Sequence, residues 1–476
     1  MATLRIRTLA ALSGLAAIAF AFELLVAMAG PARSDSADDG RTSISSDDSS
    51  GVVTSIFLNG ASLDRRNPFF KSLGTNGRSC GTCHVPGIDW TITPEYVQEV
   101  FKSTKGMDPL FAAVDGMNSP NADCSTPSAR KAASSMLLTK GLIRVGIGIP
   151  QNAEFTLDSC DDPYGYASAA ELSLFRRPLP TTNLGFLTTV MWDGRESTAP
   201  STSPISALAP DADNRARLIA DLRHQAADAT LGHAQALAAP TDDQLTQIVG
   251  LELNTATAQR QSIGAGSLTA EEALGGPFSL LNQPFYVTIN DVLGADHFGN
   301  AFNPSAMTLY RSWLNSPDPK RRQIARGEVL FNTKAISITQ VAGLNDVLHL
   351  PVIHGFCTSC HDAPNVGDHS VALPINIGTS DASRRTPDMP LYTLRNIATG
   401  ETTQTTDPGR AMVTGKWADI GKFKGPVLRG LAARAPYFHN GIAATLGDAV
   451  DFYDTRFGIG FTEQEKGDLI AFLESL

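Results

Sequence analysis

An excess of basic residues is lacking in this chain, so its composition does not point to nucleic-acid binding. The 476 residues include 38 Lys and Arg against 48 Asp and Glu, a formal charge of −10, so the basic footprint of nucleic-acid binding is absent. Segments of alternating apolar and polar residues are also lacking, which predicts little β-sheet. Cysteine is scarce, with six residues in the whole chain, so the positions of those six are informative.

The N-terminal 29 residues have the pattern of an export signal. Arg5 and Arg7 precede an apolar run over 9–29 that ends in an Ala-Met-Ala cleavage pattern. Glu23 interrupts this run, and because a carboxylate is costly at bilayer depth, a permanent transmembrane anchor is the less favoured alternative. Residues 30–50 are rich in Ser, Asp and Gly, which predicts a disordered leader. We therefore expect a periplasmic protein with no membrane span after signal removal.

Four of the six cysteines fall in two copies of the motif Cys-x-x-Cys-His. In each copy the two thiols can form thioethers with the vinyl groups of a porphyrin, and the adjacent histidine is then held under the iron as its proximal ligand. A single copy could also be a redox dithiol or half of a zinc site, but two copies favour two covalently bound haem c groups. The expected attachment residues are Cys80, Cys83, Cys357 and Cys360, and the expected iron ligands are His84 and His361.

Helical periodicity predicts a mostly α fold with long irregular connections, and the two haem motifs predict two cytochrome-c-like haem domains within it. We expect an N-terminal haem domain over 51–315, with a large insertion over 91–173, and a C-terminal haem domain over 316–476. Helices are predicted over 93–102, 128–140, 214–227, 242–253, 306–314, 325–331 and 462–476. Because haem supplies much of each domain's apolar core, sheets of any size are not expected.

The two remaining cysteines, Cys124 and Cys160, lie between the first haem motif and Trp192. In an oxidising compartment such a pair favours a disulfide, and two free buried thiols are the alternative.

The far side of each iron decides the chemistry of each haem. A haem with two strong protein ligands transfers electrons, whereas an open face can react with peroxide or dioxygen. No histidine lies between His84 and His224, so the first haem cannot take a second histidine from nearby sequence. The other ligands available there are methionines, which are more often core residues. They are Met107, Met117, Met136 and Met191.

Two further segments resemble the bacterial di-haem cytochrome c peroxidases and their relative MauG. Residues 177–183, followed by Trp-Asp-Gly-Arg at 192–195, resemble that family's Arg-Asn-x-Pro-Thr and Trp-Asp-Gly-Arg pattern. Residues 428–446 are similar to its C-terminal signature. With both haem motifs in the expected order, the resemblance spans most of residues 65–476 and leaves the substrate open.

The resemblance implies roles for two aromatic residues. Trp192 would lie between the haems as an electron relay, with a core tryptophan as the alternative. In the family, the residue fourteen positions after the signature histidine ligates the second iron, as methionine in typical peroxidases and as tyrosine in MauG. Fourteen positions after His439 stands Tyr453, and a phenolate ligand would stabilise oxidised iron. The rival ligands are Met412, His354 and His369.

The chain departs from the family where proton transfer is expected. Typical members have Gln-Ala ten residues after the tryptophan and a catalytic Glu ten residues beyond that glutamine. Here Gln225 follows Trp192 by 33 residues, and Gln235 stands at the position of the acid. Since an amide cannot accept a proton, the expected acid–base residue is His233, and His224 is a second candidate.

A second departure concerns a metal ion. The resemblance implies calcium between the domains, held partly by the Asn of Arg-Asn-x-Pro-Thr, and that position is Pro178 here. Calcium is therefore possible here but unsupported by this sequence.

These features together predict a periplasmic di-haem c-type peroxidase of the MauG-like kind. It would reduce hydrogen peroxide through a high-valent iron intermediate, with electrons drawn from a small periplasmic donor protein or an oxidisable substrate. Two alternatives stay open. One is a di-haem oxygenase that acts on dioxygen, and the other is a plain di-haem electron-transfer protein.

Overall fold

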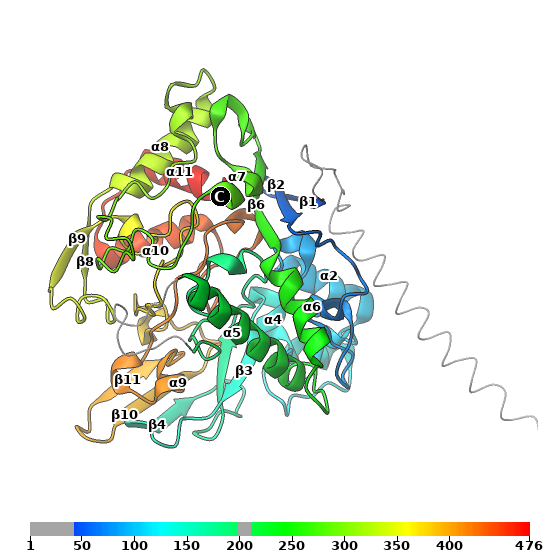
Figure 1. Ribbon diagram of the computed structural model, residues 1–476. Helices are drawn as coiled ribbons and strands as arrows, with labels where there is room; N and C mark the ends of the chain where they lie inside the picture. Colours follow the sequence, from blue (N-terminus) through cyan, green and yellow to red (C-terminus); the bar gives the residue numbers. More distant parts are fainter. Residues whose placement is uncertain (1–41, 199–210) are drawn as a thin grey trace, which may run out of the picture.

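The computed structural model describes residues 42–198 and 211–476, without the side chains of 211–213 (Figure 1). The predicted export signal over 1–29 and residues 30–41 of the predicted leader lie outside the described residues. Within the described ranges, no helix is both long enough and apolar enough to cross a membrane.

Ten α-helices form in the described part of the chain, and most begin at a side-chain cap. The Thr93 hydroxyl caps α2, and Thr241 and Thr462 form capping boxes at the starts of α6 and α11. The helices are α2 (Pro94–Thr104), α3 (Pro127–Ala133), α4 (Ser135–Lys140), α5 (Asp211–Gly232), α6 (Asp242–Leu253), α7 (Gly276–Asn282), α8 (Pro319–Thr333), α9 (Ala411–Thr414), α10 (Leu446–Phe457) and α11 (Glu463–Leu473).

The prediction of a fold without sheets is wrong, because the described residues form four antiparallel sheets. The largest has the order β1-β2-β6-β7, the second has the order β11-β10-β4, and two hairpin-like pairs are β3-β5 and β8-β9. The strands are β1 (Ser43–Asp48), β2 (Gly51–Phe57), β3 (Ile143–Ile147), β4 (Phe155–Asp161), β5 (Leu172–Arg176), β6 (Thr255–Ser262), β7 (Gly266–Ser267), β8 (Ile336–Thr339), β9 (Val352–Gly355), β10 (Leu391–Asn396) and β11 (Thr402–Thr405).

The prediction of a disordered leader over 30–50 is wrong for its C-terminal part, which belongs to the first sheet. Residues 42–50, the C-terminal part of that leader, form β1 and its turn into β2. In the turn, the Asp48 carboxylate accepts hydrogen bonds from the backbone N–H groups of Ser50 (2.7 Å) and Gly51 (2.9 Å). Across the strands, the hydroxyls of Ser45 and Thr54 lie 2.9 Å apart. The polar residues that suggested disorder thus satisfy each other within the sheet.

The second sheet joins the insertion to a distant segment. β4 comes from the insertion over 91–173 and pairs with β10, and Figure 1 shows β4, β10 and β11 side by side at the lower left. Cys160 lies in β4 opposite Tyr392, whereas Cys124 is an exposed free thiol. The predicted disulfide between Cys124 and Cys160 is therefore wrong, because Cys160 is a free thiol within the paired strand β4 and Cys124 is a free thiol at the surface.

The backbones of α8 and the C-terminal helix α11 lie very close to each other at Gly327. An added Cβ at Gly327 of α8 would lie 2.0 Å from the Asp468 carbonyl oxygen of α11 and 2.6 Å from the Cβ of Phe472. Their shared core also contains Trp313 and other residues from the segment over 265–313, so this segment packs with the C-terminal helices.

Only the end of the helix predicted over 306–314 is helical, as the 3₁₀ turn Arg311–Asn315. The Glu328 carboxylate accepts the backbone N–H groups of Leu309 (2.5 Å) and Tyr310 (2.8 Å) instead.

Candidate haem centres

Two large cavities lie in the described part of the chain, and each contains one Cys-x-x-Cys-His motif. The first cavity has a volume of about 170 Å³ and is lined by Cys80, Cys83 and His84. The second has a volume of about 220 Å³ and is lined by Cys357, Cys360 and His361. Apolar atoms make up most of the wall of each cavity. The cavities fit a large apolar group beside each motif.

Each motif histidine is oriented by a backbone carbonyl. The Nδ1 of His84 lies 3.1 Å from the carbonyl oxygen of Trp90, and the Nδ1 of His361 lies 2.6 Å from that of Gly367. Burial lowers the pKa of His84 to about 4 and also lowers the pKa of His361. Both imidazoles are therefore neutral, with Nε2 left to bind a metal, which is the arrangement of a metal-ligating histidine.

The wall between the cavities carries buried positive charge. Arg177, Lys424 and Arg434 each line both cavities. Arg177 donates to the carbonyl oxygens of Lys140, Gly141, Arg434 and Ala435, and no described carboxylate pairs with it. Burial lowers its pKa to about 9. Buried cations without anionic partners are costly, and the two propionates of a haem would supply such partners. The residues thus fit haem in charge as well as in the apolar lining of the cavities.

Trp192 lines both cavities, as its predicted position between the haems requires. Its indole Nε1 donates to the Arg177 carbonyl oxygen at 2.8 Å. The ring centroid of His439, which lines the second cavity, lies 6.3 Å from that of the indole.

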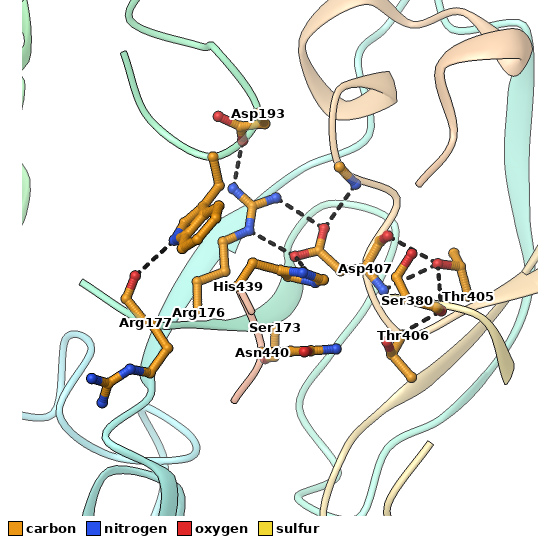
Figure 2. A network of polar contacts seen from close by, with 12 residues as sticks. Ser173, Arg176, Arg177, Asp193, Ser380, Thr405, Thr406, Asp407, His439 and Asn440 are labelled. Atoms are coloured by element: carbon orange, nitrogen blue, oxygen red, sulfur yellow. Dashed lines mark hydrogen bonds and ion pairs between the residues drawn. The ribbon is translucent and has the colours of Figure 1, made fainter. Parts of the chain in front are cut away.

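A buried ion network holds the loop that follows the tryptophan. The Arg176 guanidinium lies between two carboxylates, 2.5 Å from Asp193 and 2.7 and 2.9 Å from the two oxygens of Asp407 (Figure 2). The two aspartates hold the pKa of Arg176 above its usual value although burial acts to lower it. Because Asp407 precedes α9 and Arg176 ends β5, the network links segments far apart in the sequence.

Tyr453 lies in the wall of the second cavity, on α10. Phe457 stacks on its ring, with centroids 6.4 Å apart, and its hydroxyl makes no hydrogen bond with the described residues. Burial raises the pKa of the phenol. Among the rival ligands, His369 also lines this cavity, whereas His354 and Met412 do not.

Two of the predicted catalytic residues near α5 line the first cavity. Gln225 lies within α5, and His233 directly follows the helix. The Nδ1 of His233 is hydrogen-bonded to the Asp115 carboxylate, whose other oxygen pairs with Arg78. A buried carboxylate on Nδ1 fixes the orientation of the ring and leaves Nε2 as the atom that can act on a substrate.

Two other predicted residues lie away from this cavity. Gln235 is exposed, and its side-chain oxygen accepts a hydrogen bond from Asn76 at 3.2 Å. His224 is exposed and its Nδ1 lies 2.7 Å from Glu196. Of the four methionines considered as ligands of the first iron, Met191 lines the first cavity and the other three do not.

Sequence reasoning missed two buried carboxylates of the first cavity. Asp115 comes from the insertion, and no local pattern pairs it with His233. Glu252 of α6 is 3% exposed, and its Oε2 has no hydrogen-bond partner within 42–198 and 211–476. Burial raises the pKa of Glu252 to about 8. The signal in the sequence that could have indicated Glu252 is an acidic residue within the apolar stripe of the helix predicted over 242–253.

The residues around Pro178 do not fit calcium. The Pro178 carbonyl already accepts the Thr91 hydroxyl at 2.6 Å, and the nearby cavity walls carry Arg177, Lys424 and Arg434. Calcium prefers six to eight oxygen ligands that include carboxylates. The three buried cationic side chains would instead repel a calcium ion.

The site therefore has the features of a haem-binding redox protein, and comparisons with known proteins agree. "Cytochrome-c peroxidase IdrP2" of Denitromonas iodatirespirans is 35% identical over 136 residues, which is 26% of this chain and 36% of that protein. "Cytochrome-c peroxidase IdrP1" of Pseudomonas sp. (strain SCT) is 33% identical over 145 residues, or 25% and 36% of the two chains. "Cytochrome c551 peroxidase" of Nitrosomonas europaea is 31% identical over 121 residues, or 25% and 30%.

The predicted resemblance to the di-haem cytochrome c peroxidases is thus confirmed, although the chain spans only about a third of the length of these curated relatives. No protein-family model matches the chain.

Among solved structures, a MauG-like protein associated with microbial copper homeostasis has a TM-score of 0.29 at 19% identity, covering 65% of this chain and 77% of that one. A variant of the diheme peroxidase BthA from Burkholderia thailandensis has a TM-score of 0.31 at 15% identity, covering 94% and 93%. TM-scores this low do not establish a shared fold.

Proposed function

We propose that this protein is a periplasmic di-haem c-type peroxidase of the MauG-like kind that reduces hydrogen peroxide. The observation that carries the proposal is the position of Trp192 in the wall shared by two cavities that each contain a Cys-x-x-Cys-His motif. The sequence similarity to curated cytochrome c peroxidases supports the same activity. Export to the periplasm is supported by the N-terminal sequence and by the compartment in which c-type haems are attached.

The two cavities would have different tasks. Cys80, Cys83 and His84 would hold one haem in the first cavity, and Cys357, Cys360, His361 and Tyr453 would hold the other in the second. Bound haem supplies the redox chemistry with peroxide, which we assign to the first cavity because it contains His233. The Tyr453 phenolate would favour the oxidised form of the second centre.

His233 would move the proton that peroxide reduction requires. Asp115 holds Nδ1, so Nε2 is the atom that accepts a proton from peroxide and returns it to the departing oxygen. The Gln225 amide, in the same wall, would orient peroxide by hydrogen bonding but cannot take its proton.

Trp192 would relay electrons between the centres. It contributes to both cavity walls, and its N–H bond to the Arg177 carbonyl fixes the ring. The electrons would finally come from a small periplasmic donor protein or from an oxidisable substrate.

The test begins with the purified holoprotein. Mass spectrometry is expected to show the mature chain plus two haems. The ferric EPR spectrum should contain a high-spin signal that is abolished by stoichiometric peroxide, and Trp192→Phe should keep both haems but slow oxidation of the second centre. Only low-spin signals, with no peroxide reaction, would identify an electron-transfer protein. Incorporation of labelled dioxygen into a product without peroxide consumption would identify an oxygenase.

A further inference from the structure

The segment 428–434, at the start of the C-terminal signature, contacts the two loops that orient the motif histidines. One loop supplies the Trp90 carbonyl oxygen that is bonded to His84, and the other supplies the Gly367 carbonyl oxygen that is bonded to His361. Such carbonyls set the orientation and the basicity of a metal-ligating imidazole. The residues that hold these two loops in place therefore affect both centres.

The loop that orients His84 has a strained backbone. Asp89 and Trp90 are consecutive residues in the left-handed region, with φ of 47° and 56°. This conformation is unfavourable for residues other than glycine, and it persists where the surrounding structure fixes it. Trp90 is fixed by its indole N–H, which donates to the Ser55 hydroxyl at 2.9 Å, and its carbonyl oxygen also accepts the backbone N–H of Thr181 at 3.2 Å. The position of Asp89 has a separate cause.

The segment 428–434 holds Asp89 in place. The Asp89 carboxylate is completely buried, and neither of its oxygens accepts a hydrogen bond from the described residues. The Nε of Arg434 lies 3.3 Å from Oδ2, and a Cβ added at Gly430 would lie 2.6 Å from Oδ1. Burial raises the pKa of Asp89 while the Arg434 guanidinium acts to lower it. Because a buried carboxylate without hydrogen bonds is costly, the contact with Arg434 is what stabilises Asp89 here.

The same segment packs on the loop that orients His361. The backbone N–H of Leu428 donates to the Val366 carbonyl oxygen at 3.0 Å. A Cβ added at Gly367, where φ is +84°, would lie 2.8 Å from the Leu428 side chain. The carbonyl that is bonded to His361 therefore belongs to a residue that fits against Leu428 only as glycine.

The two contacts belong to one short element. The 3₁₀ turn Leu431–Ala433 lies between Leu428 and Arg434, and the Nη2 of Arg434 donates back to the Arg429 carbonyl oxygen at 3.3 Å. The side chain that contacts the first loop is thus anchored on the backbone that contacts the second.

We propose that the segment 428–434 is a shared positioning element for the two iron ligands. Through Asp89 it fixes the carbonyl oxygen that orients His84, and through Gly367 it fixes the carbonyl oxygen that orients His361. Asp89 is therefore a positioning residue for the first centre, although it does not line the cavity. The inference rests on the proposed binding of two haems, and it does not need the reaction with peroxide.

The first test uses the holoprotein, after mass spectrometry has shown two bound haems. Asp89→Asn removes the charge next to Arg434 and Asp89→Gly removes the side chain, and both new residues tolerate a left-handed backbone. Loss of the contact should let the Trp90 carbonyl move away from His84, which makes the imidazole a weaker donor. Resonance Raman spectra of the ferrous first haem should show the iron–histidine stretching band several wavenumbers lower in both variants. The matched control, Asp221→Asn, removes a buried carboxylate paired with another arginine and should keep the wild-type band.

The second test acts at the other end of the segment. Gly367→Ala places a methyl group against Leu428 and should displace the carbonyl that is bonded to His361. The reduction potential of the second haem should then rise, because a weaker hydrogen bond leaves the imidazole a poorer electron donor. Gly400→Ala is the matched control, since Gly400 also has a positive φ (+74°) but a Cβ there meets no described atom within 4 Å. Spectroelectrochemical titration should give this control the wild-type potential.

The outcomes separate the inference from the proposed function. Wild-type bands in both Asp89 variants, or a wild-type potential in Gly367→Ala, would overturn the shared role of the segment. Equal shifts in the control variants would overturn it as well, because they would show a general loss of stability. If the Asp89 variants do not fold, Arg434→Gln breaks the same contact from the other side and should lower the same band. A protein that binds two haems but does not react with peroxide would contradict the proposed function alone, whereas a protein without haem would overturn both.

Discussion

The Nδ1 of His233 is hydrogen-bonded to a carboxylate oxygen of Asp115, and the other oxygen of that carboxylate pairs with Arg78. The three residues come from the end of α5, the insertion and the loop before the first haem motif. Asp115 and Arg78 have side chains that are 4% and 3% exposed. The Arg78 guanidinium holds the pKa of Asp115 below its usual value although burial acts to raise it, so Asp115 remains an anion that orients the imidazole.

We expect His233→Ala to slow the reaction with peroxide by roughly 10²–10⁴-fold, the usual contribution of a positioned acid–base group. Asp115→Asn should cause a smaller loss, because the imidazole remains but its orientation is no longer fixed. Stopped-flow absorption of the holoprotein measures both rates. His224→Ala, at an exposed site outside the cavity, is the control and should react as wild type does. A wild-type rate in His233→Ala would assign the proton transfer to another group.

Gln235→Glu should leave the peroxide rate within about twofold of wild type. The position matches the family's acid in sequence, but the side chain is exposed and bonded to Asn76 rather than placed in the first cavity. The same stopped-flow measurement checks this expectation. A large increase in rate would mean that this side chain reaches the cavity when haem is bound.

The elements that the sequence predicted are those with local signals. The helix predicted over 242–253 from its periodicity has the observed bounds of α6, and a capping box of Thr241 and Gln244 fixes its start. β4 and β10 could not be predicted, because they pair across more than 200 residues and neither alternates strongly. β1 was mistaken for disorder because its polar side chains find partners on other strands, as Ser45 does with Thr54 of β2 and Asp48 with Gln259 of β6.

The same division applies to the site. His84 and His361 follow from motif spacing alone, and both lie in the cavity walls. Asp115 is 118 residues from His233, so only the folded chain brings them together. The prediction for Gln235 failed for a different reason. Its position in the sequence matches that of the family's acid, but the turn after α5 directs its side chain outward.

Gly327→Ala should destabilise the protein by at least about 1–3 kcal/mol, the usual cost of overpacking. Its Cβ would meet the Asp468 carbonyl oxygen at 2.0 Å, and a backbone atom cannot yield as a flexible side chain does. Denaturant-induced unfolding followed by tryptophan fluorescence measures the change. Gly467→Ala on α11 is the matched control, since its Cβ meets only the Gln323 amide at 3.8 Å. That variant should be neutral or slightly more stable, and equal losses in both would contradict the packing argument.

Glu252→Gln should flatten the pH dependence of stability between about pH 5 and 8. The carboxyl has a pKa near 8 in the folded protein and near 4.3 when unfolded. The folded state therefore keeps its proton while the unfolded state loses it, so stability falls as pH rises through this window. The slope is at most about 1.4 kcal/mol per pH unit. Urea midpoints at pH 6 and pH 8 should differ more in wild type and in the exposed control Glu401→Gln than in Glu252→Gln. Equal differences in all three would mean that Glu252 is ionised in the folded holoprotein.

Tyr453 is the residue with which the nature of the second centre can be tested most directly. Its ring is held by aromatic neighbours on α10, and its hydroxyl has no partner among the described residues, so an iron in the second cavity is the natural partner for the oxygen. Tyr453→Phe removes the ligand atom, and the second haem should then bind cyanide or azide and have a higher reduction potential, because a phenolate stabilises ferric iron.

Tyr453→His should instead give the low-spin EPR and absorption spectra of a bis-histidine haem. The matched control is Tyr437→Phe, which removes a hydroxyl from the same cavity wall, one that is bonded to the Leu431 carbonyl oxygen at 3.0 Å. Its haem spectra should be those of wild type. If both Tyr453 variants also keep the wild-type spectra, another residue holds the iron. His369→Ala would then be expected to open the second haem, because His369 is the rival ligand that lines this cavity, and its buried Nδ1 has no hydrogen-bond partner among the described residues.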